Sequence, residues 1–490
     1  MRKFNFIAVA IAVVLVGCSK SDVTTNEGDR DDATINLEGN LEVSDFVWKG
    51  LNQYYYWQDQ VANLADSKAA NPTAYAQLIQ ENSDPEAFFE SLNHPDDRFS
   101  WIVDNYVDLE NTLAGIEASN GMEFLLTRQC SSCAAIVGVV IYIEPNSDAE
   151  AKGVERGDIF SHVDGTLLTN SNYRDLLFSD DLNYTIELAT VQNDGFVRTG
   201  ESFALVKEEN FQTNPILVNK ILDVGGAKVG YLMYNRFLNE FDEALNDVFG
   251  NFQSAGVNEL VLDLRYNPGG SVQTCIYLAS MITGSNDGTV FSKEQWNPKL
   301  MAYWEENNPS RLTDRFTGFI AGGTEINSLN LSRVYVLTSS RSASASELLI
   351  NGLTPHIEVI HIGDQTRGKN VGSITVYDYI DNEGTKNPNH TYAMQPIVLK
   401  IANSENFSDY TDGLEPDITL KESFSNLGVL GDPNEPLLQR ALSEISGTAT
   451  AKSGVVHHPI THALPLPQDA FLEQMHVQLQ KATATQSENK

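Results

Sequence analysis

Residues 342–369 combine a serine and a lysine, the two residue types that the simplest serine hydrolases need. A Ser-Ala-Ser-Ala-Ser-Glu run at 342–347 follows an apolar stretch, and Gly368 and Lys369 follow another. Lys369 comes 25 residues after the middle serine, Ser344, which is enough chain for a helix and a returning strand. A neutral amine beside a serine hydroxyl can remove its proton and make the oxygen nucleophilic. The spacing therefore indicates Ser-Lys hydrolytic chemistry.

Both residues also have an ordinary structural interpretation. Ser344 and Glu347 form a Ser-x-x-Glu capping box before an apolar helix, and a nucleophile at a helix start is compatible with that role. Lys369 could be a solvent-facing turn lysine. A lysine base needs a pKa lowered from ~10.4, chiefly by burial, and the apolar residues at 357–362 favour such a site.

A second segment, residues 261–270, reads Val-Leu-Asp-Leu-Arg-Tyr-Asn-Pro-Gly-Gly. It predicts a buried strand that ends in a glycine turn and opens a helix. Such a turn presents N–H groups, and Gly269 or Gly270 together with the Ser344 N–H could form an oxyanion hole. Phosphate binding is the alternative, but no Lys-Ser/Thr pair follows the glycines.

The amino terminus resembles an export signal. Arg2 and Lys3 precede an apolar stretch at 7–16 and Leu-Val-Gly-Cys at 15–18. The stretch is shorter than the ~20 residues that span a bilayer, which favours cleavage over a membrane anchor. A cysteine at this point resembles a bacterial lipobox, so we expect residues 1–18 to be a lipoprotein signal peptide and Cys18 to be lipidated. Residues 19–41 are predicted to form a disordered tether.

Charge and cysteine usage exclude several classes of protein. A net charge of −34 argues against nucleic-acid binding, and we expect membrane contact only through the lipid anchor. Cys130 and Cys133 are predicted to form a disulfide, whereas Cys275 stands alone. No spacing of ligands indicates a metal site, and no cofactor is expected. The three histidines near the C-terminus are interpreted as surface residues rather than metal ligands (His457, His458 and His462).

The spacing of apolar residues changes along the chain and predicts several domains. Residues 42–105 are helical and 110–208 alternate as β-strands do, whereas 212–445 alternate strands and helices as in an α/β domain. An insertion is expected at 285–330. Residues 446–490 are a low-complexity tail with one short helix at 470–479.

Residues 145–159 resemble the most recognisable stretch of a PDZ domain, a short helix followed by a Gly-x-x-x-Gly-Asp turn. In such domains a loop binds the terminal carboxylate of a peptide, which adds a strand behind the loop. The resemblance places this peptide-binding loop at Gly121, Met122, Glu123 and Phe124.

The three motifs together resemble the C-terminal processing (tail-specific) serine peptidases over residues 42–440. The resemblance implies a crotonase/ClpP-like α/β catalytic domain, a β-rich PDZ domain that precedes it or is inserted in it, and a small helical N-terminal region. It assigns Ser344 as the nucleophile, Lys369 as the base and a glycine of the Gly269-Gly270 turn as the oxyanion donor. It also implies an endopeptidase of the bacterial cell envelope, periplasmic or surface-exposed, acting on proteins or peptides with exposed C-termini.

The sequence departs from this family beside the lysine. Ser373 stands where family members often have a glutamine that orients the amine, Asn370 replaces a common glycine, and Asp364 replaces a frequent glutamate. The third member of the catalytic site therefore stays open. Two alternatives also remain, a catalytically inactive PDZ-containing peptide-binding lipoprotein of the same fold and a carrier of apolar ligands. The second rests only on aromatic residues of the insertion (Trp296, Tyr303 and Trp304).

Overall fold

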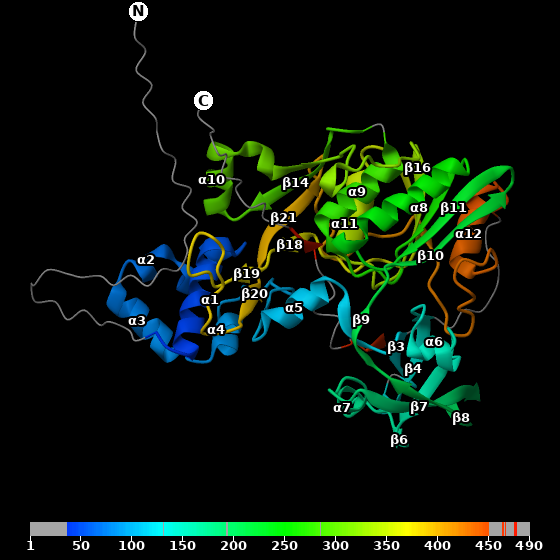
Figure 1. Cartoon of the computed structure of the whole chain (residues 1–490), viewed down its shortest axis with the longest axis horizontal. Coiled ribbons are helices and arrows are strands. Elements are labelled where there is room, and N and C mark those ends of the chain that lie inside the picture. The colour runs from blue at the N-terminus through cyan, green and yellow to red at the C-terminus, as the bar shows by residue number, and fades with distance from the viewer. Residues whose placement is uncertain are drawn as a thin grey trace, which may run out of the picture. The chain divides into compact units, whose positions relative to one another are not determined.

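The computed structural model describes residues 37–130, 132–192, 195–284, 286–449, 463–464, 466 and 475–477 (Figure 1). It divides into two compact units, Met1–Val107 with Thr375–Pro396 and Asp108–Ile374 with Ile397–Lys490. The predictions for Cys18, His457, His458 and His462 lie outside the described residues.

The first unit is mainly helical, as the sequence predicts. Its helices are α1 (Asn40–Tyr54), α2 (Asp66–Ala69), α3 (Pro72–Glu81) and α4 (Pro85–Ser91). Side chains of Asn71 and Asp84 cap α3 and α4, each before a proline at the first helical position. α1 packs on α4, and both contribute buried aliphatic and aromatic side chains (Phe46, Val47, Leu51, Phe88 and Phe89).

A small sheet brings a later segment into this unit. β1 (Trp101–Val103) pairs with β20 (Ala393–Gln395), which pairs with β19 (Val376–Tyr377). The sequence interpretation assigned residues 375–396 to the α/β domain, because chain continuity was the only signal for them. Hydrogen bonding to β1 instead places this segment with the helices.

The second unit begins with a β-rich region. α5 (Tyr106–Leu113) leads to β2 (Ile116–Ser119), which pairs with β9 (Glu208–Gln212). The main sheet contains β3 (Met122–Arg128), β4 (Ile136–Ile143), β5 (Ile159–Val163), β7 (Asn183–Gln192) and β8 (Gly195–Val206), with β6 (Thr166–Leu167) beside β5. Two short helices, α6 (Asp148–Lys152) and α7 (Tyr173–Leu177), complete the region.

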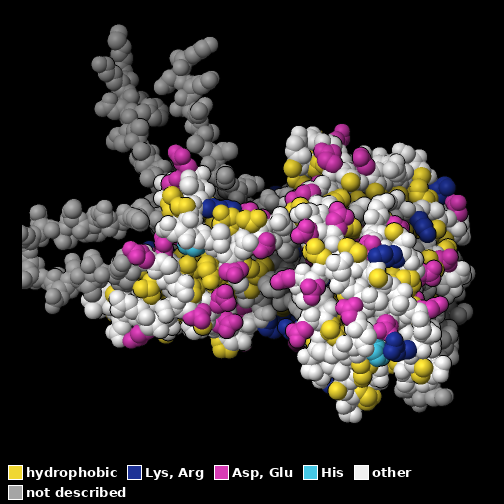
Figure 2. Space-filling view, turned by 60° about the horizontal axis from the view of Figure 1, so that its bottom comes forward, with side chains coloured by type: hydrophobic (Ala, Val, Ile, Leu, Met, Phe, Trp, Pro, Cys, Tyr) yellow, Lys and Arg dark blue, Asp and Glu magenta, His cyan; other side chains and the backbone are white. Residues whose placement is uncertain are grey.

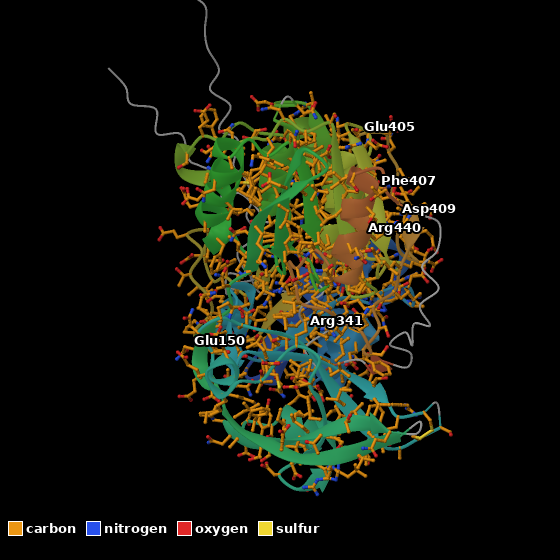
Figure 3. All side chains as sticks on the ribbon, turned by 90° about the vertical axis from the view of Figure 1, so that its right-hand side faces the viewer. Glu150, Arg341, Glu405, Phe407, Asp409 and Arg440 are labelled. Carbon is orange, nitrogen blue, oxygen red and sulfur yellow. A yellow bond between two sulfur atoms is a disulfide. The ribbon has the colours of Figure 1, made fainter. Side chains whose placement is uncertain are left out.

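The remainder of the second unit is an α/β region. One sheet has the order β10 (Ile216–Val224), β11 (Ala227–Tyr234), β12 (Glu259–Asp263), β16 (Arg333–Thr338), β17 (Glu358–Gly363) and β22 (Ile418–Thr419). All neighbours are parallel except β10 and β11. The helices are α8 (Asp242–Ser254), α9 (Val272–Thr283), α10 (Pro298–Asn307), α11 (Ala345–Leu353) and α12 (Pro436–Ile445). α12 carries Arg440 and packs on β12, β16 and β17 (Figure 3).

A second sheet contains part of the C-terminal tail. Its order is β13 (Gly270–Ser271), β24 (Met475–His476), β18 (Val371–Ser373), β21 (Ile397–Asn403), β14 (Val290–Trp296) and β15 (Thr313–Arg315). Another tail strand, β23 (Ala463–Leu464), pairs with β3. The helix predicted over 470–479 is therefore wrong at Met475 and His476, because pairing with two strands overrides local propensity.

Acidic side chains are scattered over the surface face in Figure 2, among fewer basic ones. This distribution matches the excess of acidic residues in the sequence. That face carries no extended basic patch of the kind that a phosphate backbone needs.

Candidate active site

Three neighbouring parallel strands deliver the residues that the sequence analysis singled out. β12 leads to the Gly269-Gly270 turn, β16 leads to Ser344, and β17 leads to Lys369. β16 lies between β12 and β17, and all three run in the same direction. Since the carboxyl ends of parallel strands meet at one edge of a sheet, the fold brings the three segments together there.

The three serines of the 342–346 segment differ in their hydrogen bonds. The Ser342 hydroxyl donates to the Leu264 carbonyl at 2.8 Å, and the Ser346 hydroxyl donates to the Asn267 carbonyl at 3.0 Å. The Ser344 hydroxyl is fully buried and makes no hydrogen bond, although its oxygen occupies the predicted capping-box position beside the N–H of Glu347. Buried hydroxyls are nearly always paired, so an unpaired one points to a role other than stability.

The backbone of Ser344 is also unusual. Its φ is 60°, a left-handed conformation that residues with a Cβ rarely adopt, and it immediately precedes α11. The Ala343 N–H donates to the Asn267 carbonyl, which ties the serine segment to the glycine turn. Strained backbone at a helix start, held by its neighbours, is typical of functional positions.

A single buried carboxylate, Glu347, links the serine segment to the lysine segment. Its Oε2 accepts the N–H of Ser344 and the N–H of Lys369, each at 2.8 Å. Its Oε1 accepts the Gly368 N–H and the Thr366 hydroxyl, each at 2.6 Å. Burial raises the pKa of Glu347, and these hydrogen bonds act in the opposite direction. The sequence indicated only the capping role of this residue, because nothing in its spacing reveals the bonds to 366–369.

Lys369 is buried, with 2% of its surface exposed, so the solvent-facing alternative is wrong. Gly368 before it has φ 86°, and a Cβ there would lie 2.2 Å from the Thr411 carbonyl oxygen. The turn therefore requires glycine at 368. Because the Ser344 hydroxyl has no hydrogen bond, this structure contains no hydrogen bond from it to Lys369. Catalytic hydrogen bonds often form only when substrate is bound.

The two candidate N–H groups of the glycine turn differ in direction. The Gly269 N–H donates to Asn267 Oδ1 at 2.8 Å. Ser271 N donates to the Phe237 carbonyl and the Gly269 carbonyl accepts from Phe237 N, so the N–H and carbonyl of Gly270 face away from Phe237. Together with the bond from Ser344 N to Glu347, this corrects the sequence interpretation. Neither Gly269 N–H nor Ser344 N–H is available to an oxyanion in this structure.

A buried ion network supports the same turn. The Arg265 guanidinium is fully buried and pairs with Asp263, Glu422 and Glu435 at 2.7–3.0 Å. Arg156 of the β-rich region donates to the Tyr266 hydroxyl at 2.7 Å and pairs with Glu422 at 2.8 Å. The β-rich region is thus joined to the residues that precede Asn267.

A further cation, Arg341, belongs to the chain segment that leads to Ser344. Arg341, three residues before Ser344, lies where the β-rich and α/β regions meet (Figure 3). Burial raises the pKa of Tyr142 in β4, and the positive charge of Arg341 opposes that rise.

The predicted peptide-binding loop is largely strand. Gly121 precedes β3, and Met122, Glu123 and Phe124 are its first residues. The Gly121 N–H donates to Ser119 Oγ and the Met122 N–H donates to Asn120 Oδ1, both at 3.0 Å. These two N–H groups are therefore engaged within the chain, whereas the outer edge of β3 receives β23 at Leu126 and Thr127.

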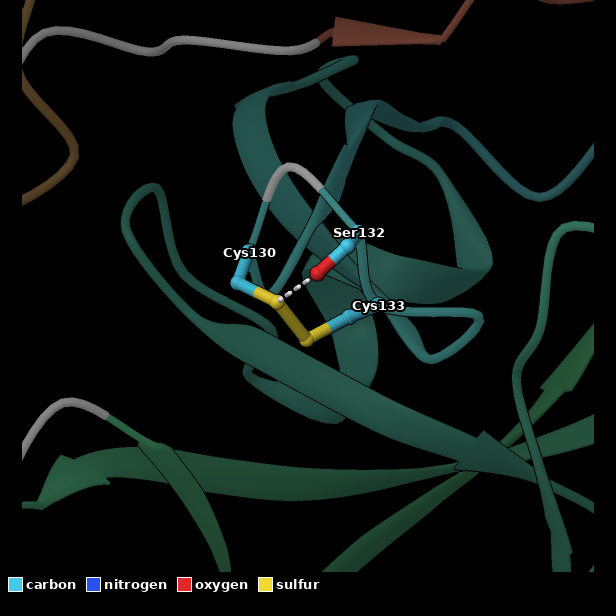
Figure 4. The surroundings of a disulfide bond; sticks show 3 residues. All are labelled: Cys130, Ser132 and Cys133. Carbon is cyan, nitrogen blue, oxygen red and sulfur yellow. Dashed lines mark hydrogen bonds between the residues drawn. A yellow bond between two sulfur atoms is a disulfide. The ribbon is translucent and has the colours of Figure 1, made fainter.

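Three cysteines and one tryptophan were also singled out from the sequence, and the structure describes each of them. Cys130 and Cys133 form a disulfide beside Ser132 (Figure 4). Cys275 is a buried free thiol. Trp296 is buried in β14, where its indole N–H donates to Glu294 at 2.8 Å.

Two features are absent from the described residues. No helix among them is both long and apolar enough to span a membrane. They also contain no group of three or more His, Cys, Asp or Glu side chains that could hold a metal ion.

Ser373, the open third position, lies on β18. Its hydroxyl is 3.5 Å from the carbonyl oxygen of Met475 in the tail.

A buried unpaired serine, a buried lysine and a strained glycine turn are the residue set of a serine-type hydrolase.

Comparison with known families assigns the chain. The model of the peptidase S41 N-terminal domain matches residues 42–101, and that of peptidase family S41 matches residues 228–420. The chain belongs to peptidase family S41, a family of serine-type peptidases. The matched regions contain α2, α3, α4, most of α1 and all three site segments.

Individual relatives agree with this assignment. The chain is 25% identical over 290 residues to a carboxyl-terminal-processing protease of Picosynechococcus, covering 58% of this chain and 62% of the relative. It is 25% identical over 255 residues to a chloroplastic C-terminal processing peptidase of Tetradesmus obliquus, covering 50% of each chain. The alignments thus span less than two thirds of these relatives. A crystal structure described as a candidate S41 protease of Bacteroides fragilis matches with a TM-score of 0.63 at 25% identity, covering 83% of this chain and 98% of that one.

Proposed function

We propose that this chain is a serine endopeptidase with Ser344 as nucleophile and Lys369 as general base. The observation that carries the proposal is the contrast among three neighbouring serines. Two hydroxyls donate to backbone carbonyls, and only the Ser344 hydroxyl is buried without a partner. The buried Lys369 is held close to it, because the backbone N–H groups of Ser344 and Lys369 donate to the same oxygen of Glu347.

The reaction follows from these roles. Ser344 Oγ attacks the peptide carbonyl carbon while its proton passes to the neutral amine of Lys369. The tetrahedral intermediate collapses, the C–N bond breaks, and the lysine returns the proton to the leaving amine. Water then attacks the acyl-enzyme carbonyl carbon while Lys369 takes its proton. The C–O bond to Ser344 Oγ breaks, Lys369 returns the proton to Oγ, and the carboxylic acid leaves.

Two backbone N–H groups are suited to the oxyanion. Gly270 directs its N–H away from Phe237, to the side on which β24 lies in this structure. Ala345 is the first residue of α11, and its N–H has no partner within that helix. The sequence analysis missed Ala345, although the first N–H groups of any helix are candidates for binding negative charge.

We further propose that the β-rich region is a PDZ domain, that the α/β region has a crotonase/ClpP-like fold, and that substrates are selected by their C-terminal ends. Support comes from the outer edge of β3, which pairs with the antiparallel strand β23 at Leu126 and Thr127, as peptide-binding sheets pair with an extended peptide. The Arg156 contacts to Tyr266 and Glu422 join this region to the glycine turn. An unfolded protein with a free apolar C-terminus should then be cut faster than its C-terminally amidated form. Equal rates would contradict selection by C-termini while leaving the peptidase proposal intact.

A cell-envelope location with a lipid anchor on Cys18 is also proposed. It rests on the signal-like residues 1–18, and the Cys130–Cys133 disulfide suits an oxidising compartment. In a Gram-negative host the protein should partition with membranes, and Cys18→Ala should release it or leave the signal uncleaved. Recovery of the unsubstituted mature protein entirely in the soluble fraction would contradict the anchor.

The alternative function is a catalytically inactive peptide-binding lipoprotein. The unpaired Ser344 hydroxyl in the described structure favours the enzyme, because a binding protein gains nothing from a strained, unsatisfied serine. Casein turnover by the purified chain, abolished in Ser344→Ala and retained in Ser346→Ala, tests the choice. Absence of turnover in every variant would favour the binding protein.

A further inference from the structure

The C-terminal tail lies on the β-rich region as an added strand. Ala463 and Leu464 pair antiparallel with Thr127 and Leu126 of β3. The opposite edge of β3 pairs with β4, so without the tail β3 would be the edge strand of its sheet. Figure 1 shows the short red strand of the tail beside β3. An open edge of this kind takes an extended peptide through its backbone groups.

Apolar side chains of the tail fill the core behind this edge. Leu466 is 97% buried, with 3% of its surface exposed, and belongs to the same hydrophobic cluster as Met122 and Phe124. Leu464 packs against that cluster too. The tail runs antiparallel to β3 and therefore towards its first residues, where a peptide end would lie in the proposed PDZ domain.

A second tail strand enters the candidate active site. β24 lies between β13, which begins at Gly270, and β18, which ends at Ser373. Met475 pairs with Gly270, and Val477 N donates to the Ser373 carbonyl at 3.0 Å. Met475 and Val477 are both buried. Because Gly270 turns its N–H and carbonyl away from Phe237, these groups face β24.

The tail strand is also what joins β13 to the second sheet. In the sheet order β13 contacts only β24, and β18 lies on the other side of β24. Removal of the tail would leave an open strand-shaped slot between the glycine turn and the segment after Lys369. A substrate in extended conformation would fit the same slot and use the same backbone groups.

We infer that the tail is an intramolecular occupant of the peptide-binding path, held at β3 through Leu464 and Leu466 and in the active site through Met475 and Val477. This inference rests on the proposed function, because it identifies the path by the catalytic residues. The path takes an extended peptide parallel to β13, with apolar side chains at both docking points. Both points hold internal residues of the tail, so docking of this sequence needs no free C-terminus.

The test uses the full chain with Ser344→Ala, which prevents turnover. The probe is a fluorescein-labelled synthetic peptide with the sequence of residues 460–480, and its binding is followed by anisotropy. Leu466→Asp with Met475→Asp should displace the tail and raise probe affinity at least tenfold, since the tethered tail competes at a high effective concentration. Ala449→Asp adds one such charge at an exposed position outside both tail strands and should leave affinity unchanged. Equal affinities in all three chains, or no binding to any, would overturn the inference.

Hydrogen exchange provides a readout that does not depend on the probe. The amides of residues 475–477 should be protected in the unsubstituted chain and exchange at least tenfold faster in the Leu466→Asp, Met475→Asp chain, with β16 and β17 still protected. Loss of protection throughout the chain would mean unfolding. The same exchange measurement on the milder Leu466→Ala, Met475→Ala chain would then test whether the tail is docked. Fast exchange of 475–477 in the unsubstituted chain would contradict docking.

Turnover separates this inference from the proposed function. With Ser344 present, the tail-displaced chain should cut a peptide substrate at least fivefold faster than the unsubstituted chain. If neither cuts anything, the peptidase proposal fails, but the binding and exchange results still decide where the tail lies. If both cut equally, occupancy of the path is wrong and the peptidase stands.

Discussion

Ser344 and Lys369 donate their backbone N–H groups to the same oxygen of Glu347, each at 2.8 Å. The two residues follow neighbouring strands, β16 and β17, so one carboxylate fixes the separation of their main chains. Burial works against the charged form of Glu347, and four donors oppose that effect. Geometry at the nucleophile and at the base therefore depends on a residue that itself takes no part in bond breaking.

Glu347→Gln should weaken both stability and catalysis. The amide keeps one acceptor oxygen and turns an NH2 group towards donors that now lack a partner. We expect the free energy of unfolding to fall by ~2–4 kcal/mol. Displacement of Ser344 or Lys369 should lower kcat by ~10–100-fold. Urea unfolding and steady-state kinetics check this against Glu358→Gln on the exposed face of β17, expected within ~0.5 kcal/mol of the unsubstituted chain. A Glu347→Gln chain with unchanged kcat would contradict the linking role.

Gly270→Ala should affect kcat more strongly than it affects the stability of the fold. Gly270 has φ 135°, and a Cβ there would lie 2.2 Å from the Phe237 carbonyl oxygen, so the turn must shift. The proposed oxyanion N–H moves with it, and loss of one such donor costs ~10²–10³ in kcat. Gly318→Ala is the matched control, because the nearest atom to its Cβ would be 3.7 Å away and its φ is not positive. Normal kinetics in Gly270→Ala would remove Gly270 from the oxyanion site.

Tail docking should weaken as the pH falls. The His476 Nδ1 is buried without a hydrogen-bond partner, and burial lowers the pKa of this histidine to about 4. β13 and β18, the strands beside it, contribute only Gly270, Ser271 and residues 371–373, which carry no titratable side chain. Docked His476 thus binds fewer protons than released His476, whose pKa is near 6.5. Docking is therefore strongest above pH 6.5 and is lost as the pH falls towards 4.

This pH dependence has a specific magnitude. Between pH 7.5 and 5.5, the ratio of released to docked tail should rise by roughly tenfold. Hydrogen exchange of 475–477, corrected for the intrinsic pH dependence of exchange, measures it. His476→Gln carries no titratable ring and should remove the effect, so an identical pH profile in that variant would contradict this explanation.

The chemistry-bearing segments could be predicted because each is a short local pattern. The strand, glycine turn and helix around Gly269-Gly270 and the helix after Ser344 follow from residues adjacent in the chain. The α/β order over β11 to β17 likewise follows from apolar runs of the expected length.

The remainder depends on contacts between distant residues. Nothing near Glu347 indicates its bonds to Thr366, Gly368 and Lys369. The sequence alone leaves Gly269 and Gly270 equal as oxyanion donors, because only the folded turn shows that the Gly269 N–H is bonded to Asn267. The tail looked like a polar segment with one helix, because a two-residue strand has no sequence period of its own. Pairing of Met475 with Gly270 comes from the partner strands alone.

The most direct test of the account is kcat/KM for one peptide substrate across single-residue variants, in the full chain and in the tail-displaced chain. Ser344→Ala and Lys369→Ala should each lower kcat/KM by ~10⁴-fold or more, and the double variant should lose little beyond either, because the two residues act as a unit. Ser342→Ala and Ser346→Ala should stay within ~tenfold of the unsubstituted enzyme, since their hydroxyls bond to the carbonyls of Leu264 and Asn267. Full activity in Ser344→Ala or Lys369→Ala, or loss confined to Ser346→Ala, would contradict the assignment of nucleophile and base.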